Sequence, residues 1–340
     1  MTKLAEAARA NALIASTLVW DNHACMPLRP GDDRFLPQLE RAQSSGVSVV
    51  TLNIGFGEQS PEQHLEVLVW FRHWLAARPE QYLLVRSTAD LEHAHTSGRL
   101  GVLFDIEGTR AIGDQLGRIQ QYRDLGVGWM LLAYNRRNLV GSGCLDTPDE
   151  GLTAFGRDVI AEMNRVGMML CLSHTGERTA REAMDISARP PIFSHSNCRA
   201  VYEHPRNISD LLIRACAARN GVIGINGIGD FLGPAGTPLV PALIAHIDHA
   251  VQMVGPYHVG LALDYVYDQD ELRDYLTTMP ALFPDGLPDE LPLVPPEAFC
   301  DIVEGLIGLG YGDEAIRAVL GGSWRRVAAE NWDEASLRLG

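Results

Sequence analysis

Short apolar runs alternate with amphipathic segments along most of the chain. Several of these runs are apolar throughout, which is typical of parallel strands that are covered on both faces. The pattern predicts strands at 16–20, 47–52, 82–85, 101–104, 129–133, 168–172, 191–193, 222–225 and 259–263.

The segments between these runs predict helices. The clearest covers 61–77, where Leu65, Leu68, Phe71 and Leu75 recur at roughly helical spacing. Similar patterns occur at 156–166, 179–186, 209–220 and 241–254.

This alternation over 340 residues predicts an α/β protein, and we expect a TIM-type (β/α)8 barrel formed by one domain, residues 1–340. A doubly wound sheet is the alternative, weakened because no Gly-rich GxGxxG turn follows any predicted strand. The Pro-, Asp- and Leu-rich stretch 282–296 predicts a loop excursion before closing C-terminal helices that start at Glu297.

Composition narrows the possible partners and the compartment. The chain has 28 Lys and Arg against 43 Asp and Glu, a formal net charge of −15, which disfavours nucleic acid and anionic membranes as partners. The six cysteines form no CxxC pair, so we expect them to be reduced. Neither a signal peptide nor a membrane-spanning run is evident, and the expected location is the cytoplasm.

Residues capable of chemistry follow the predicted strands, at the end where parallel barrels build their active sites. In extended chain Asp21, His23 and Cys25 would share one face, and all three side chains can bind metal. The run 101–104 leads into Asp105 and Glu107, and a carboxylate can bridge two metal ions. Each fragment by itself is also consistent with ordinary loop or helix-capping residues.

Two further runs end in Ser-His, at His174 and His195, and imidazole with carboxylate is a ligand set that suits zinc. A lone histidine at a strand end is usually a structural residue, but two in step with Glu107 favour a metal site. Asp264 ends the run 259–263 and suits a general acid or base, or equally a turn cap. Arg206 follows in a loop and suits a carboxylate clamp, or is an ordinary surface residue.

Taken in this order, the residues resemble the membrane (renal-type) dipeptidase family, metallopeptidase family M19, which has an amidohydrolase-like barrel. The resemblance runs from about Val19 to the C-terminus. Its best stretches are 104–108, 132–143, 151–174, 192–207 and 246–264.

The resemblance implies a metal-dependent hydrolase that cleaves the peptide bond of dipeptides with a metal-bound hydroxide. His23 would bind a first metal ion, Glu107 would bridge two, and His174 and His195 would bind the second. The family pattern is His-x-Asp where this chain has His23-Ala24-Cys25. Cys25 is therefore a candidate thiolate ligand, and zinc is expected as one or two ions.

The resemblance also implies roles in substrate binding and catalysis. Arg206 would hold the substrate carboxylate, Asp264 would move protons, and Glu107 would act through the metals. Tyr134 falls where the family often has a substrate-contacting His. The implied partner is a small molecule, and relatives make a homodimer conceivable.

Two other functions remain open from the sequence. A metal-dependent amidase or lactonase would use the same site on a non-peptide small molecule. An inactive barrel retained as a binding protein is the second, and the change at Cys25 is its only support.

Overall fold

The computed structural model describes residues 3–282 and 290–336, and its strands close into a parallel α/β barrel. Pairing runs in chain order around eight strands and closes where Asp21 of the first pairs with Leu261 of the last. These strands are β1 (Trp20–Cys25), β2 (Val49–Phe56), β4 (Leu100–Glu107), β5 (Val127–Leu131), β6 (Met169–Cys171), β7 (Ile192–Phe193), β8 (Val222–Asn226) and β9 (Val259–Ala262). The predicted (β/α)8 barrel is therefore confirmed, and the doubly wound alternative is wrong.

Two short strands accompany the ring. β3 (Tyr82–Leu84) pairs with the first residues of β4, and β10 (Tyr265–Val266) pairs with the end of β1. β9 pairs with the start of β1, at Asp21, and β10 pairs with its end, at Ala24 and Cys25. Asp264 lies in the gap between β9 and β10.

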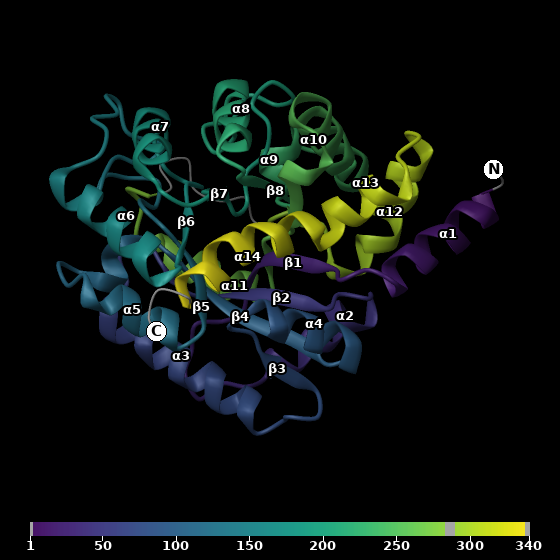
Figure 1. The fold of residues 1–340 in the computed structure, drawn as a ribbon, viewed down its shortest axis with the longest axis horizontal. Coiled ribbons are helices and arrows are strands. Elements are labelled where there is room, and N and C mark those ends of the chain that lie inside the picture. The colour runs from purple at the N-terminus through teal and green to yellow at the C-terminus, as the bar shows by residue number, and fades with distance from the viewer. Residues whose placement is uncertain (1–2, 283–289, 337–340) are drawn as a thin grey trace.

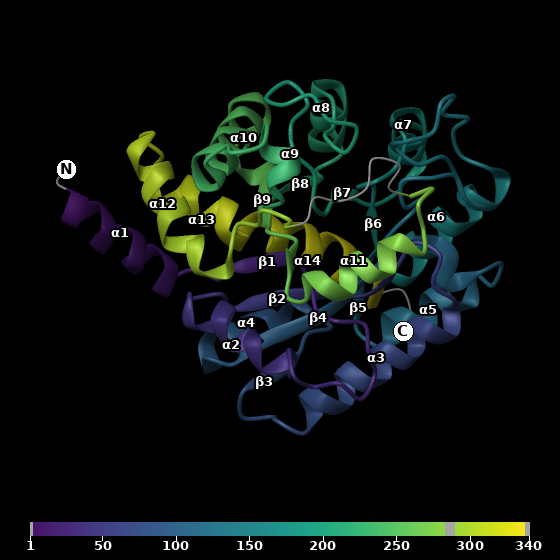
Figure 2. The ribbon, with the colours of Figure 1, turned by 180° about the vertical axis from the view of Figure 1, so that it is seen from behind.

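Helices surround the strands (Figure 1), and two of them cover opposite faces of the molecule. α14 lies in front of the strands in Figure 1, and α11 lies in front when the molecule is turned round in Figure 2. The described helices are α1 (Lys3–Ala15), α2 (Leu39–Ser44), α3 (Pro61–Ala76), α4 (Thr88–Ser97), α5 (Gly117–Asp124), α6 (Ala154–Val166), α7 (Glu177–Ile186), α8 (Asp210–Ala218), α9 (Gly229–Leu232), α10 (Leu239–Val254), α11 (Gln269–Thr277), α12 (Phe299–Gly308), α13 (Asp313–Arg317) and α14 (Ser323–Ser336).

Local sequence signals define several helix ends. Ser60 and Gln63 form a capping box at the start of α3, where Pro61 occupies the first helical position. Thr153 caps α6 by accepting the N–H of Gly156, and α6 ends at Gly167, which has a left-handed backbone (φ 77°). These caps explain why the predicted bounds of α3 and α6 are close to the observed ones.

The predicted first strand, 16–20, is wrong. The Ser16 and Thr17 hydroxyls donate to the carbonyls of Ala12 and Leu13 at 2.7 and 2.6 Å, so this segment ends α1. The strand starts at Trp20 and runs through Cys25. The polar residues that follow Trp20 are therefore strand residues, which a search for apolar runs cannot recognise.

The predicted excursion at 282–296 lies partly outside the described residues, at 283–289. Its described part packs on the rim of the barrel: the Pro292 carbonyl accepts the N–H of Gly229, and the N–H of Val294 donates to Gly227. The predicted closing helices after Glu297 correspond to α12, α13 and α14.

One end of the barrel interior is filled by a tryptophan-rich cluster. Trp324 of α14 is fully buried against Trp20 of β1, with ring centroids 6.4 Å apart, and its indole N–H donates to the Leu261 carbonyl at 3.0 Å. A Cβ added to Gly260 would lie 2.4 Å from the same indole. α14 thus closes the end of the barrel at which the strands begin, and leaves the opposite end for a site.

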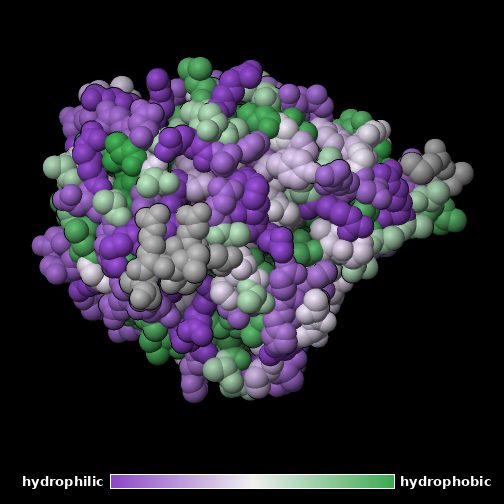
Figure 3. Space-filling view, in the orientation of Figure 1, coloured by the Kyte–Doolittle hydropathy of each residue, from purple (hydrophilic) through white to green (hydrophobic). Residues whose placement is uncertain are grey.

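The face of the molecule seen in Figure 3 is predominantly polar. Figure 3 shows hydrophilic side chains over most of one face, with apolar ones scattered among them. Among the described residues, no helix combines the length and the apolar character that crossing a membrane requires.

We predict that Trp324→Ala will lower the free energy of unfolding by about 3–5 kcal/mol, because the change leaves a cavity and removes the hydrogen bond to the Leu261 carbonyl. Urea denaturation followed by circular dichroism measures this. Leu309→Ala is the control, because Leu309 is 55 % exposed. Equal stability of the two variants would contradict the role given to Trp324.

Candidate metal centre

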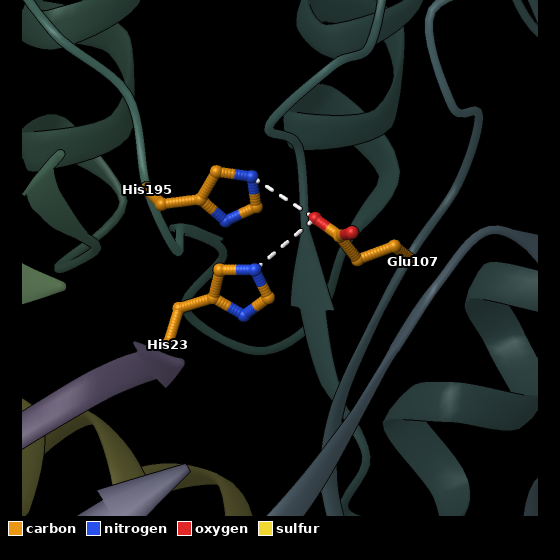
Figure 4. Close-up of side chains that lie close together, drawn as sticks. All are labelled: His23, Glu107 and His195. Carbon is orange, nitrogen blue, oxygen red and sulfur yellow. Dashed lines mark ion pairs between the residues drawn. The ribbon is translucent and has the colours of Figure 1, made fainter. Parts of the chain in front are cut away.

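Three histidines from different strands converge on one carboxylate at the C-terminal end of the barrel. His23 lies on β1, Glu107 ends β4, and His174 and His195 follow β6 and β7. The Nε2 atoms of His23, His174 and His195 are 3.5, 3.4 and 3.0 Å from Oε1 of Glu107. Figure 4 shows two of these approaches, from His23 and His195. All four side chains are buried, and Glu107 Oε1 accepts no hydrogen bond.

The other ring nitrogen of each histidine is held by a neighbour. His23 Nδ1 donates to Oδ2 of Asp105 at 3.0 Å, and Oδ1 of Asp105 accepts from Asn53 Nδ2 at 2.9 Å. Because an ionised carboxylate only accepts, this pair leaves the lone pair of His23 on Nε2. The same arrangement orients metal-binding histidines in many proteins.

His174 and His195 are oriented by neutral partners. His174 Nδ1 lies 2.7 Å from the amide oxygen Oδ1 of Asn135, and His195 Nδ1 lies 2.8 Å from the hydroxyl of Ser194. Because the Asn135 oxygen can only accept, His174 Nδ1 donates; when His195 Nδ1 also donates, to the Ser194 hydroxyl, both Nε2 atoms carry lone pairs, and they lie only 2.9 Å apart. Two facing lone pairs at this distance repel each other unless a cation lies between them.

A second group of donor atoms adjoins the first. Cys25 Sγ is 3.6 Å from His23 Nε2 and 3.5 Å from Asp264 Oδ1, and His23 Nε2 is 3.3 Å from the same Asp264 oxygen. Asn226 Nδ2 donates to the other Asp264 oxygen at 2.7 Å. These spacings match those between ligands of a tetrahedral ion at about 2.0–2.3 Å. Two sets of side chains therefore lie close enough together to hold a metal ion, His23 with Glu107 and His195, and His23 with Cys25 and Asp264.

Burial dominates the electrostatics of the cluster. It raises the pKa of Glu107 to about 8 and raises that of the Cys25 thiol. It also lowers the pKa values of His174 and His195 well below the usual range, with a further contribution from Arg206. For His23 burial is again the largest influence and lowers the pKa, but the charges of Asp105, Cys25, Glu107 and Asp264 together outweigh it, and the pKa is raised.

The backbone is strained at several of these positions. Asn135, His174 and Asp264 have φ angles of 59°, 60° and 57°, a region that residues other than glycine seldom occupy. Such strain concentrates at functional sites, where surrounding contacts enforce it. Here those contacts include the hydrogen bond between Asn135 and His174 and the bond from Asn226 to Asp264.

Arg206 and Tyr134 lie beside the cluster. Arg206 is 7 % exposed, its Nε has no partner, and its guanidinium lies 5.3 Å from the centre of the Phe231 ring. Its Nη2 makes only a long contact, 3.5 Å, to the His195 carbonyl. The Tyr134 ring stacks on His174 with centroids 4.1 Å apart. A buried guanidinium with so few partners is suited to binding an anion.

A cavity of about 350 Å³ opens onto these residues and reaches Cys25, Glu107, His174, Arg206 and Asp264. Its remaining lining is mainly apolar and includes residues at the end of β2, in the segments that follow β1 and β8, and in α9 and α11. A neighbouring cavity of about 590 Å³ is bordered mostly by charged residues of α7 and the adjacent loops. It meets the first cavity at His174, Pro205 and Arg206.

Every candidate residue named from the sequence lies in this region: His23, Cys25, Glu107, Tyr134, His174, His195, Arg206 and Asp264. Asp21 is separate in role, because its Oδ1 accepts the Leu263 N–H at 2.8 Å.

Sequence reasoning missed the supporting residues Asn53, Ser194 and Asn226, and it did not give Asn135 this role. Asn53 had a usable signal: it follows an apolar run, and in the β2–β4 register it pairs with Asp105.

Comparisons with known proteins agree with this geometry. The family model of the membrane dipeptidases (peptidase family M19) matches residues 7–336. A dipeptidase of Clonostachys rogersoniana is 33 % identical over 260 residues, 75 % of this chain and 61 % of the relative. An uncharacterised dipeptidase of Schizosaccharomyces pombe is 32 % identical over 191 residues, 55 % of this chain and 47 % of the relative. The chain thus aligns with only about half to three fifths of these curated relatives.

Among solved structures, an amidohydrolase from Pseudomonas aeruginosa superimposes with a TM-score of 0.86 at 26 % identity. The match covers 95 % of this chain and 99 % of that structure.

We predict that Asp105→Asn will weaken zinc binding about 10- to 100-fold, because an amide cannot hold the His23 ring as a carboxylate does. Competition with a chromophoric chelator measures the affinity. Asp114→Asn, on the exposed surface, is the matched control. If both variants bind zinc as the unchanged protein does, Asp105 does not support a metal ligand.

Proposed function

Because the chain belongs to the membrane dipeptidase family (peptidase family M19), we propose that it is a metal-dependent hydrolase that cleaves the peptide bond of dipeptides. The observation that carries the metal dependence is the buried Glu107 Oε1, which accepts no hydrogen bond although three imidazole Nε2 atoms lie within 3.5 Å. Burying such an oxygen unsatisfied is costly, and a cation satisfies it.

The donor set fits zinc. Neutral imidazole, carboxylate and thiolate are its usual ligands. Glu107, His174 and His195 would hold one ion, and His23 with Cys25 would hold another beside Glu107. Support for the second position comes from the distances of 3.3–3.6 Å among His23, Cys25 and Asp264.

A divalent ion bound here would lower the pKa of a water molecule and polarise a substrate carbonyl. Asp264 would accept the proton of the attacking water and pass it to the leaving amine; support comes from its Oδ1, which lies 3.3 Å from His23 Nε2 and 3.5 Å from Cys25 Sγ. Asn226 holds the other oxygen, Oδ2, and so fixes the direction in which Oδ1 points.

Arg206 would orient the substrate. Its buried, nearly unpartnered guanidinium lines the same cavity as Glu107 and Asp264, and a guanidinium binds a carboxylate through two parallel hydrogen bonds. A free carboxylate close to the scissile bond is a property of dipeptides. Tyr134, which packs on His174 and lines the same cavity, would also contact the substrate.

We expect Glu107→Gln to lose bound metal and to lower kcat/KM for dipeptides by about 100-fold or more, because loss of a direct ligand should exceed the effect of losing its support. Elemental analysis of the purified protein and a dipeptide hydrolysis assay measure the two effects. Glu62→Gln, on the surface of α3, is the control. A Glu107→Gln protein with full metal content and activity would rule out the proposed site.

Cys25 has a prediction of its own. Cobalt(II) bound at the His23 side should give a near-ultraviolet sulfur-to-metal charge-transfer band, because only thiolate ligands produce one. The band should disappear in Cys25→Ser and persist in Cys144→Ser, whose thiol bonds to Asn135 at the edge of the site. A spectrum that is identical in all three proteins would show that Cys25 is not a ligand.

A further inference from the structure

An apolar wall stands beside the candidate carboxylate-binding residue. It consists of Ile228, Phe231, Val266, Leu272 and Leu291, which form a cluster separate from the barrel core and all line the 350 Å³ cavity. The cluster packs outside the barrel core, and the side of it that lines the cavity can contact a bound ligand.

The wall is held in place by polar contacts at its edges. The side chain of Gln269 accepts the N–H of Leu291 at 2.9 Å and donates to its carbonyl at 3.2 Å, which ties this residue to α11. The Gly229 N–H bonds to the Pro292 carbonyl at 2.7 Å, which ties the same segment to α9. The wall therefore presents a preformed surface.

Phe231 joins the wall to Arg206. The guanidinium carbon lies 5.3 Å from the ring centre, and His204 packs on the same ring at 4.8 Å. A substrate residue whose carboxylate is bound by Arg206 would therefore have its side chain near Phe231. In a dipeptide that residue is the C-terminal one.

The acidic groups beside the wall are partly compensated. Asp268 and Glu271 line the cavity, but both pair with Arg29, at 2.7 and 3.2 Å. Asp230 also lines the cavity, and burial raises the pKa of its carboxyl group, which disfavours its charge.

We propose that the apolar wall selects dipeptides whose C-terminal residue has a large apolar side chain. This inference rests on the proposed function, because it assumes that Arg206 binds the substrate carboxylate. Phe231 and Leu272 are then specificity-determining residues: they contact the side chain and take no part in the chemistry.

The test compares kcat/KM of the zinc-loaded protein for Ala-Gly, Ala-Leu and Ala-Lys. We expect Ala-Leu to exceed Ala-Gly by about 10- to 100-fold, the gain from burying a leucine side chain. Ala-Lys should be no better than Ala-Gly. Phe231→Ala and Leu272→Ala should each reduce the ratio of Ala-Leu to Ala-Gly by about 10-fold, mainly through KM. Leu309→Ala, at an exposed residue that does not line the cavity, should keep the ratio.

The outcomes separate this inference from the proposed function. Equal turnover of Ala-Leu and Ala-Gly, or a preference for Ala-Lys, overturns the selectivity and leaves dipeptide hydrolysis intact. A Phe231→Ala protein that loses both apolar and glycine substrates equally overturns the role of the wall, because the ring would then act only by supporting Arg206. No hydrolysis of any of the three dipeptides overturns the proposed function together with the inference.

Discussion

A buried carboxylate without a hydrogen-bond donor constrains much of this structure. Burial destabilises the charged form of Glu107, and no donor among the described residues offsets this by a hydrogen bond to Oε1. The barrel tolerates this because parallel strands bring their C-terminal ends to one rim, where histidines on β1 and after β6 and β7 surround the Glu107 oxygen at the end of β4. Trp324 of α14 closes the opposite end of the barrel. The apolar packing around Trp324 and the charged cluster therefore occupy different ends of the barrel interior.

Each of the three histidines directs Nε2 towards Glu107 because a neighbouring side chain hydrogen-bonds to its Nδ1 atom. The partners of these Nδ1 atoms are Asp105, Asn135 and Ser194, and the Nε2 atom of each ring therefore faces the Glu107 carboxylate. Asn135 also connects the site to the segment that follows α11, because its side-chain amide donates a hydrogen bond to the Leu282 carbonyl. Strained backbone at Asn135 and His174 is kept in place by the same contacts.

The two sides of Glu107 differ in their chemistry. One side offers two neutral imidazoles, and the other offers an imidazole polarised by Asp105 together with a thiol and the Asp264 carboxylate. The cavity above them is also asymmetric, with Arg206 beside an apolar wall built from α9, α11 and the segment around Leu291. Together these features describe a site that would position a small zwitterion by its carboxylate and its adjoining side chain.

The sequence by itself determined the fold class and the residues at the strand ends, because parallel strands buried on both faces leave long apolar runs and because chemistry-bearing residues follow those runs directly. It could not locate β1 (Trp20–Cys25), because three consecutive polar residues interrupt the apolar pattern: Asp21 accepts the Leu263 N–H, Asn22 accepts from Thr51, and His23 faces Glu107. Nor could it identify Asn53, Ser194 and Asn226 as supports, since an amide or hydroxyl has no distinctive pattern until the register places it beside Asp105, His195 or Asp264. Only the tertiary structure decided which nitrogen of each histidine faces Glu107 and which apolar side chains stand next to Arg206, because both depend on contacts between segments far apart in the chain.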